Sequence, residues 1–395
     1  MPSRRCAVAV TVTDPPRYDT ARPRKPTALL AVMLLVTAIG GVVLPVPSPA
    51  WAGGRGEQIL GDVDGDGFAD RVTLGIVEPD YCSVIVEYGT EDGGFRLPVA
   101  HVYLRPGGSG PGTRCPELGV AVDLDTDRAE ELVVAWYPGP PPTVPYNLLV
   151  LDAAFQPSFG LLEAIFAPYH LGKADFNGDG RLDVYAVTDQ GQGIETYLNL
   201  GDGTLTHGPA GWCALPIQYA VADLYLDGRA DLVTSYAERC VPETLTSGVV
   251  VVSDDGTPQI LREDPLGVET WSAQVTHANA DRLPDIRTVS RLTGGVKHFI
   301  NTGDRYVQAP KANTDTVQLS GERPVTITVL ANDWATSGVT VTISDPPNYG
   351  TARVISGGRI VYTPRADHGR TDRFTYQLTE DGRRSSAVVY IRWTG

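Results

Sequence analysis

One short pattern recurs five times along the chain, at intervals of 48 to 61 residues. It is best preserved in residues 62–70, Asp-Val-Asp-Gly-Asp-Gly-Phe-Ala-Asp, and in residues 175–183, Asp-Phe-Asn-Gly-Asp-Gly-Arg-Leu-Asp. Weaker copies begin at Asp123, Asp223 and His277. A mean period of about 54 residues suits a four-stranded sheet and is too long for a hairpin or an ankyrin unit. The repeat therefore predicts an array of small sheets.

Strand-like segments follow every copy of the pattern. A short apolar stretch such as residues 132–136 comes first, and two further strand candidates joined by a Gly-rich turn come later, as in residues 197–205. Helical periodicity over ten or more residues is absent after residue 52, except for a helix candidate at 159–167. We therefore predict an all-β fold, a β-propeller of about five four-stranded blades.

The repeated pattern has the ligand spacing of a metal-binding loop. Oxygen-bearing side chains stand at positions 1, 3, 5 and 9, with Gly at positions 4 and 6, so that one bend of the backbone can surround a hard cation such as Ca²⁺. The alternative is a solvated acidic turn capped by Asp side chains. The candidate ligands are Asp62, Asp64, Asp66, the carbonyl of Phe68 and Asp70 in the first loop, and Asp175, Asn177, Asp179, the carbonyl of Arg181 and Asp183 in the third.

An EF-hand loop begins in the same way but needs a Glu at position 12 and flanking helices. Position 12 is Thr73 in the first loop and Ala186 in the third, and the flanking residues have the character of strands. The sequence therefore excludes an EF-hand.

The remaining three loops are degenerate. The second loop keeps four candidate ligands but lacks both glycines, and we predict a calcium site there as well, formed by Asp123, Asp125, Asp127 and Glu131. The fourth loop, residues 223–231, has Tyr225 at position 3, and the fifth, residues 277–285, has His277 at position 1. Imidazole is a poor ligand for Ca²⁺. We expect these two loops to keep the turn and assign no ion to them.

On these loops, residues 58–308 resemble the FG-GAP or VCBS repeats of integrin-like β-propellers. The resemblance rests on the Asp-rich loops and on the later turn Leu198-Asn199-Leu200-Gly201-Asp202-Gly203-Thr204. It implies that each loop joins the first two strands of a blade and holds Ca²⁺. The chain has five copies where seven blades are usual, so the sequence leaves open whether the ring closes with five blades or is incomplete.

The first 52 residues have the organisation of a secretory signal peptide. A basic stretch ending at Lys25 is followed by the apolar run 28–36 and by Ala50-Trp51-Ala52. We predict cleavage after Ala52; an uncleaved anchor formed by residues 27–44 is the alternative. The remainder, with no other segment of membrane-spanning length, is predicted to be secreted.

The charge of the remaining chain excludes one class of partner. The whole chain has 47 acidic and 32 basic residues and a formal charge of −15. Six of the basic and two of the acidic residues lie in the first 52 residues, so 45 acidic and 26 basic residues remain. A surface of this sign repels phosphate backbones, and we therefore predict that the protein does not bind nucleic acid.

Four cysteines remain after the signal peptide, and an even number in an exported chain indicates disulfides. The four cysteines do not indicate a zinc site, because the sequence has no Cys-x-x-Cys spacing. Of the three pairings that four cysteines allow, we favour Cys82 with Cys115 and Cys213 with Cys240, because each closes a loop of roughly thirty residues.

The strand pattern changes after a linker at residues 308–313. Regular alternation with turns every ten or so residues predicts a β-sandwich in residues 311–395, after a propeller in residues 53–310. This region resembles bacterial Ig-like and cadherin-like domains, through segments such as Asp372-Arg373-Phe374-Thr375-Tyr376. Asn332-Asp333 is either a cadherin-like calcium ligand or a plain turn, and we favour the turn.

Six scattered histidines accompany no recognisable catalytic motif. The sequence therefore favours binding over catalysis. We predict a secreted calcium-binding protein that binds an extracellular protein or glycan. An extracellular polysaccharide lyase or glycoside hydrolase built on the propeller, and a structural component of the cell surface, are the alternatives. Neither the ligand nor the oligomeric state can be predicted.

Overall fold

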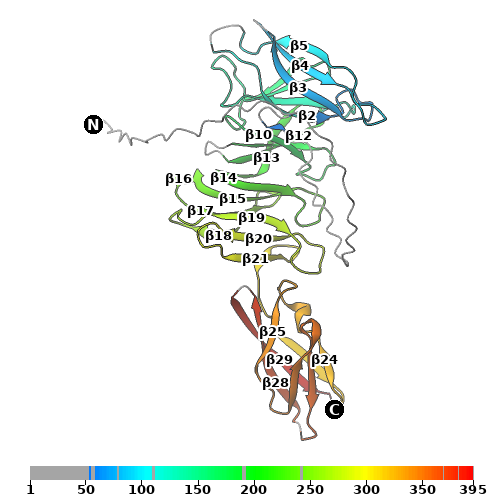
Figure 1. Cartoon of the computed structure of the whole chain (residues 1–395), viewed down its shortest axis with the longest axis vertical. Coiled ribbons are helices and arrows are strands. Elements are labelled where there is room, and N and C mark those ends of the chain that lie inside the picture. The colour runs from blue at the N-terminus through cyan, green and yellow to red at the C-terminus, as the bar shows by residue number, and fades with distance from the viewer. Residues whose placement is uncertain are drawn as a thin grey trace, which may run out of the picture. The chain divides into compact units, whose positions relative to one another are not determined.

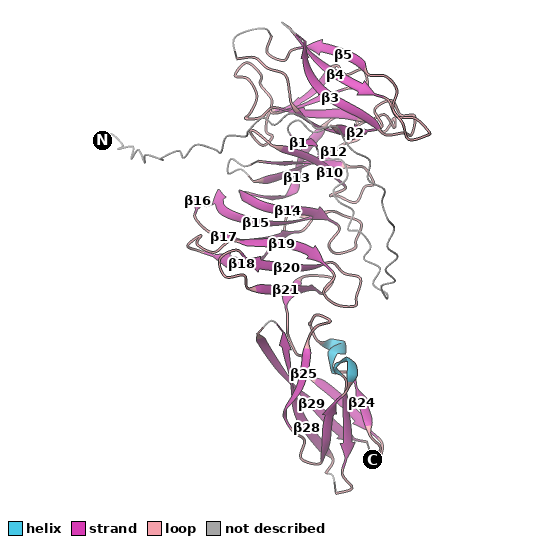
Figure 2. Cartoon of the chain, viewed as in Figure 1, coloured by secondary structure: helices cyan, strands magenta, loops and turns pink. Residues whose placement is uncertain are grey.

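The structure is a computed structural model, and it describes residues 53–54, 58–77, 80–108, 112–188, 193–240, 243–367, 369–380 and 382–394. The predicted signal peptide, residues 1–52, lies outside the described residues. The described chain is all-β, as predicted, and its helical segments are two short 3₁₀ turns, η1 (Val329–Asn332) and η2 (Ser356–Gly358) (Figures 1 and 2). None of its helices is long and apolar enough to span a membrane.

Five antiparallel sheets follow one another between residues 53 and 308, and within each sheet the strands are paired in chain order (Figure 1). Sheet 1 contains β2 (Ile59–Gly61), β3 (Asp70–Val77), β4 (Tyr81–Glu87) and β5 (Val99–Leu104). Sheet 2 contains β6 (Leu118–Val122), β7 (Glu131–Ala135), β8 (Leu148–Leu151) and β9 (Pro157–Leu161). The helix candidate at 159–167 is wrong, because its first residues belong to β9.

Sheets 3 to 5 repeat the arrangement with small additions. Sheet 3 contains β10 (His170–Ala174), β11 (Asp183–Val187), β12 (Ile194–Asn199) and β13 (Leu205–Trp212), with β1 (Gly53–Gly54) added at the edge of β10. Sheet 4 contains β14 (Ala214–Ala222), β15 (Asp231–Cys240), β17 (Ser247–Val252) and β18 (Pro258–Asp264), with β16 (Glu243–Thr244) paired to β15. Sheet 5 contains β19 (Trp271–Thr276), β20 (Asp285–Ser290), β21 (Val296–Asn301) and β22 (Tyr306–Gln308).

The five sheets pack face to face in series, each on the next sheet along the chain. Successive residues of a strand point to opposite faces of its sheet. Val133 and Ala135 of β7 pack against Val184 and Ala186 of sheet 3, whereas Leu132, their neighbour on β7, packs against sheet 1. Apolar side chains also fill the space between sheets 3 and 4 and between sheets 4 and 5. Both faces of an inner sheet are thus buried, which explains continuous apolar runs such as β7.

The outer face of sheet 1 is polar at the end of β3 that contains Arg71 and Thr73, where the inner sheets are apolar. Arg71 and Thr73 stand at the positions that Leu132 and Val134 occupy in sheet 2. Arg71 pairs with Glu87 across the strands, at 3.2 Å. Among the described strands, the extensive contacts between sheets all join successive sheets. This is the surface expected of a terminal repeat in a stacked array.

The C-terminal domain is a sandwich of two sheets. One sheet has the strand order β23 (Asp315–Leu319), β29 (Arg383–Trp393), β28 (Thr371–Glu380) and β25 (Thr340–Asp345); the other has the order β24 (Val325–Ile327), β27 (Ile360–Pro364) and β26 (Gly350–Val354). Phe374 and Tyr376 are fully buried between the sheets, as their alternation with Thr375 predicts. Within the same compact unit, Ser337 N donates to Ala278 O, in the loop between β19 and β20, at 2.9 Å.

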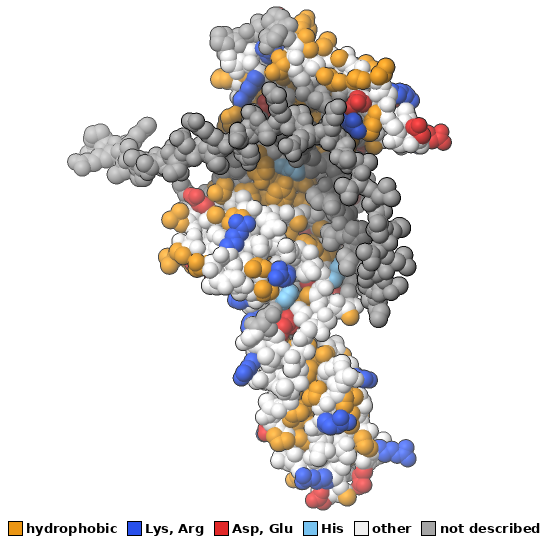
Figure 3. Space-filling view, viewed as in Figure 1, with side chains coloured by type: hydrophobic (Ala, Val, Ile, Leu, Met, Phe, Trp, Pro, Cys, Tyr) orange, Lys and Arg blue, Asp and Glu red, His pale blue; other side chains and the backbone are white. Residues whose placement is uncertain are grey.

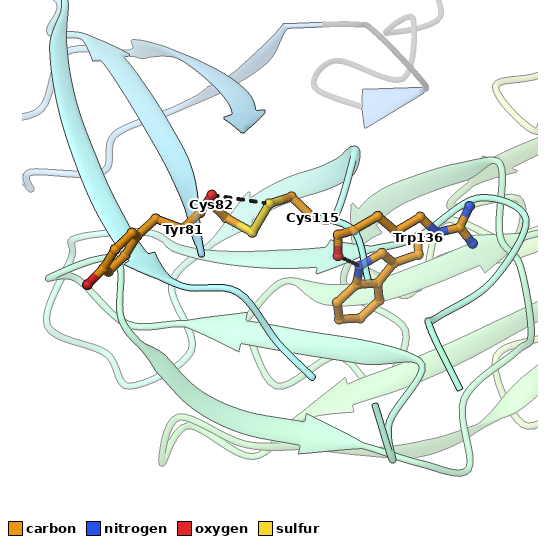
Figure 4. Close-up of a disulfide and its surroundings, with 5 residues drawn as sticks. Tyr81, Cys82, Cys115 and Trp136 are labelled. Carbon is orange, nitrogen blue, oxygen red and sulfur yellow. Dashed lines mark hydrogen bonds between the residues drawn. A yellow bond between two sulfur atoms is a disulfide. The ribbon is translucent and has the colours of Figure 1, made fainter. Parts of the chain in front are cut away.

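Two disulfides have the predicted pairing. Cys82 and Cys115 join β4 of sheet 1 to the segment before β6, and their Cα atoms are 5.6 Å apart. The bond is buried beside Trp136, whose indole N–H donates to Arg114 O at 3.0 Å (Figure 4). Cys213 and Cys240, with Cα atoms 5.4 Å apart, join the β13–β14 connection to the end of β15.

Removal of the first disulfide is expected to lower the free energy of unfolding by about 4 kcal/mol, because the bond closes a loop of 33 residues in the unfolded chain. The Cys82→Ala/Cys115→Ala variant keeps the site apolar, and urea unfolding at neutral pH measures the loss. The same titration of Cys213→Ala/Cys240→Ala provides a comparison with a similar loop. A loss below about 1 kcal/mol for the first pair would contradict the expectation.

Candidate metal loops

In four of the five loops the backbone adopts one shared conformation. Positions 4 and 6 are left-handed in the first loop, where Gly65 and Gly67 have φ angles of 72° and 90°, and in the third, where Gly178 and Gly180 have 72° and 85°. Only glycine adopts this conformation without steric cost, which is the physical reason for its recurrence at these positions.

The second loop keeps this backbone without glycine. Thr126 and Arg128 have φ angles of 70° and 86°, at a cost of roughly 1–2 kcal/mol each. Their amides donate to the two carboxylate oxygens of Asp123, at 2.7 and 3.2 Å. The fourth loop is left-handed at Leu226 and Gly228 as well. In the second loop, hydrogen bonds from main-chain amides to the Asp123 side chain therefore maintain a backbone conformation that threonine and arginine disfavour.

The fifth loop does not share this conformation. Its positions 4 and 6, Ala280 and Arg282, are not among the left-handed residues of the described chain. His277 at position 1 bonds through Nδ1 to the carbonyl of Leu283, at 3.2 Å. The fifth loop thus still joins β19 to β20 but lacks the left-handed positions, because a carboxylate at position 1 is what bonds the amide of position 6 in the other loops.

Three carboxylates converge in each of the first two loops. One oxygen from each of Asp62, Asp64 and Asp66 lies within 4.8 Å of the others, and the same holds for Asp123, Asp125 and Asp127. In the first loop, Asp62 Oδ2 accepts from Gly67 N at 2.8 Å, whereas Asp62 Oδ1 is buried and has no hydrogen-bond partner among the described residues. A buried carboxylate oxygen without a partner is costly unless a cation lies against it.

The convergence also raises pKa values. Partial burial and the nearby charges of Asp66 and Asp62 raise the pKa of Asp64. Burial, followed by the charges of Asp125 and Asp127, raises the pKa of Glu131 to about 7. Like charges held together without a counter-ion disfavour the ionised forms.

The carboxylates at position 9 accept hydrogen bonds from main-chain amides. Asp70 is fully buried, and its two oxygens accept from Val63 N at 2.8 Å and from Gly89 N at 2.7 Å. Asp183, Asp231 and Asp285 each accept two backbone amides in the same way. Glu131 accepts one, from Leu124 N at 2.8 Å. Asp70, a predicted ligand, is therefore not part of the three-carboxylate group of the first loop.

In the third loop, an arginine side chain of the loop itself pairs with one of the candidate ligands. The Arg181 guanidinium bonds Asp179 Oδ2, and Asn177 Nδ2 donates to the same oxygen at 2.8 Å. In the first loop the corresponding position is Phe68, which is exposed and whose N–H donates to Asp66 Oδ1 at 2.9 Å. In the first loop, Arg96 lies 3.8 Å from Asp66. The two loops with the best sequence match thus differ in how much of their negative charge is already paired.

A cavity of about 470 Å³ opens beside the second loop. Four carboxylates from three separate segments contribute to its lining: Asp125, Glu131, Asp152 and Asp202. It extends from the second loop to the turn that follows β12 of the next sheet, where Gly203 N donates to Leu124 O at 2.9 Å. The second loop is therefore reachable from solvent on its acidic side.

In the C-terminal domain, two further carboxylates lie close together. Tyr376 OH donates to Asp333, and Asn332 Nδ2 donates to Thr314 O at 3.1 Å. Burial, and then the charge of Asp333, raises the pKa of Asp315 to about 6. Asn332 and Asp333 thus have protein partners, which suits the plain turn favoured from the sequence.

The folded state favours protonated Asp315, so its contribution to stability is largest below the unfolded pKa near 4 and falls as the pH rises through about 6. We expect Asp315→Asn to raise the free energy of unfolding by about 1 kcal/mol at pH 8 after allowance for solvent screening, and to leave it unchanged at pH 4. Urea titrations at the two pH values measure this. Asp345→Asn, at an exposed position of β25, is the control; an equal gain in that variant would contradict the assignment.

Comparisons with known proteins identify two regions of the chain. Residues 175–234 match the model of the FG-GAP-like repeat, and residues 307–392 match that of the bacterial Ig domain. A search of curated proteins finds no match.

Among solved structures, the endo-fucoidan hydrolase MfFcnA9 of glycoside hydrolase family 107 is similar at 14% identity and a TM-score of 0.18, over 37% of this chain and 31% of that one. The endo-fucoidan hydrolase MfFcnA4 of the same family is similar at 13% identity and a TM-score of 0.19, over 60% of this chain and 35% of that one. This chain thus matches about a third of the length of those enzymes.

Proposed function

Because the chain combines an FG-GAP-like repeat with a C-terminal bacterial Ig domain, we propose that it is a secreted, calcium-binding β-repeat protein that binds an extracellular protein or glycan. The five sheets are the blades of a propeller-type array, and the first 52 residues are its export signal. The two disulfides suit an oxidising compartment.

Two observations carry the calcium proposal: the carboxylates of Asp62, Asp64 and Asp66 converge, and Asp62 Oδ1 is buried without a hydrogen-bond partner among the described residues. Oxygen donors of this kind and number suit Ca²⁺. In the first loop Asp62, Asp64 and Asp66 would hold the ion, and in the second Asp123, Asp125 and Asp127. The ion would supply positive charge and would lock the turn. In the third loop Ca²⁺ would have to displace the Arg181 guanidinium, so we expect weaker binding there.

The binding role draws support from an apolar row on the outer face of sheet 1. Val77, Tyr81 and Leu104 are cross-strand neighbours on β3, β4 and β5, and they are 41%, 41% and 66% exposed. Val102 extends the row. Figure 3 shows apolar side chains gathered over this sheet. Contiguous exposed apolar surface of this kind is typical of interaction sites.

The calcium part is tested by calorimetric titration of the chelator-treated protein with Ca²⁺. We expect at least two bound ions per chain in the wild type and one fewer in Asp64→Asn/Asp66→Asn. Asp92→Asn, which changes an exposed turn residue of the same sheet, is the control. Absence of binding at millimolar Ca²⁺ would refute this part.

The partner is tested with a glycan array and a protein pull-down, each with and without Ca²⁺, followed by an assay for new reducing ends on any glycan that binds. Binding without turnover supports the proposal, and loss of binding in Leu104→Ser would locate the partner on sheet 1. Turnover would instead indicate a polysaccharide-cleaving enzyme. Absence of binding in both assays would favour a structural component.

A further inference from the structure

Glu130 makes hydrogen bonds to both the backbone N–H and the backbone carbonyl of Asp62. Its carboxylate Oε2 accepts from Asp62 N at 2.9 Å, and its own backbone N–H donates to Asp62 O at 2.8 Å. Asp62 supplies position 1 of the first loop, and its Oδ1 is the buried oxygen without a partner. Glu130 thus determines where the first ligand of that loop stands.

Glu130 is itself a residue of the second loop, at position 8, between Asp127 and Glu131. Its other carboxylate oxygen bonds the ammonium group of Lys173, on β10 of sheet 3, and the Lys173 side chain is only 8% exposed. Segments of three successive sheets, two loops and one strand, therefore meet at one carboxylate. A buried charge pair of this kind has a definite geometry, because either partner alone would be left uncompensated.

The first two loops also approach each other closely. A Cβ atom added at Gly65, position 4 of the first loop, would lie 3.3 Å from the backbone N of Ala129, position 7 of the second. The equivalent pair, the third and fourth loops, has the main-chain bond from Ala230 N to Asp175 O at 2.6 Å. It has no carboxylate, because position 8 is alanine there. The hydrogen bond from Asp62 N to the Glu130 carboxylate, which we call the carboxylate clamp, is therefore particular to the first pair of loops.

We propose that the first and second loops bind two Ca²⁺ ions with positive cooperativity and that Glu130 is the positioning residue that couples them. Binding in the second loop restrains residues 123–131, including Glu130. Restraint of Glu130 places Asp62 for the ion in the first loop. By linkage, binding in the first loop must favour binding in the second by the same factor. This inference rests on the proposed calcium function.

The test is a double-mutant cycle on Ca²⁺ affinity, measured by calorimetry in a background that carries Asp179→Asn to silence the third loop. Asp125→Asn/Asp127→Asn leaves the first loop alone, and Asp64→Asn/Asp66→Asn leaves the second alone. We expect each isolated loop to bind at least about fivefold more weakly than in the two-loop protein, by equal factors. Equal affinities with and without the other loop would overturn the inference, and this comparison leaves Glu130 unchanged.

A second comparison tests the clamp itself. Glu130→Ala/Lys173→Met removes both buried charges together and reproduces the alanine of the fourth loop. We expect it to retain two bound ions that titrate independently, with a Hill coefficient near 1. Glu163→Gln, which removes one exposed carboxylate, should retain the cooperativity of the wild type. Retained cooperativity in the double variant would overturn the role of Glu130. Two independent sites in the wild type would overturn the inference and leave the calcium function standing, whereas absence of binding would remove both.

Discussion

Replacement of Asp183 by alanine is expected to lower the free energy of unfolding by about 4 kcal/mol. Asp183 is fully buried, and its two oxygens accept from Phe176 N at 2.8 Å and from Asn199 N at 2.7 Å. Removal of the carboxylate leaves two backbone amides without an acceptor, at about 1–3 kcal/mol each. Those amides join the third loop to the end of β12, so their loss loosens the loop and the sheet together.

Urea unfolding in the presence of excess chelator measures this effect, because the chelator removes any contribution from a bound ion. Asp183→Asn keeps one acceptor oxygen and should lose about half as much. Asp202→Ala removes a carboxylate of the same type that caps an exposed turn through Thr204 N, at 3.1 Å, and should cost less than about 1 kcal/mol. Equal losses for Asp183→Ala and Asp202→Ala would contradict the main-chain role.

Removal of Ca²⁺ is expected to lower the melting temperature by several degrees. An ion that binds only the folded state stabilises it by about 2.7 kcal/mol at a hundredfold excess over its dissociation constant. Two occupied loops therefore contribute about 5 kcal/mol, if each is saturated to that degree. The carboxylates of Asp62, Asp64 and Asp66 repel one another without the ion, which adds to the effect in chelator.

The measurement is a thermal melt at several Ca²⁺ concentrations, with Mg²⁺ at the same ionic strength as the control. The shift should grow with the logarithm of the Ca²⁺ concentration and should shrink by more than half in Asp125→Asn/Asp127→Asn, because the first loop then also binds more weakly. The same melting temperature in Ca²⁺ and in chelator would show that these loops hold no ion that stabilises the fold.

The positions of the loops and sheets could be read from the sequence. Each copy of the Asp-rich pattern lies between the first two strands of a sheet, and the C-terminal alternation of residues such as Phe374 and Tyr376 forms a sandwich. Both signals are local, because turns require particular residues at fixed offsets and strands alternate with period two. The cysteine pairing was also predictable, because the favoured pairing closes the short loops.

The chemical role of individual ligand positions could not be read in the same way. Asp64 and Asp70 are both carboxylates of one loop, yet Asp64 belongs to the converging group and Asp70 bonds two amides, one of them on Gly89, far along the chain. Glu130 gave no signal at all, since position 8 has no fixed residue type among the loops. Both roles depend on which strand ends the fold brings beside the loop.

Local patterns and the spacing of a few residues were enough to predict the all-β class, the five repeats, the two disulfides and the C-terminal sandwich. Three features could be found only in the folded chain: which carboxylates converge, the glycine-like backbone of Thr126 and Arg128, and the contacts of Glu130 with three sheets. Hydrogen bonds between distant segments outweigh local preference there, and a sequence records such bonds only through the residues at both ends.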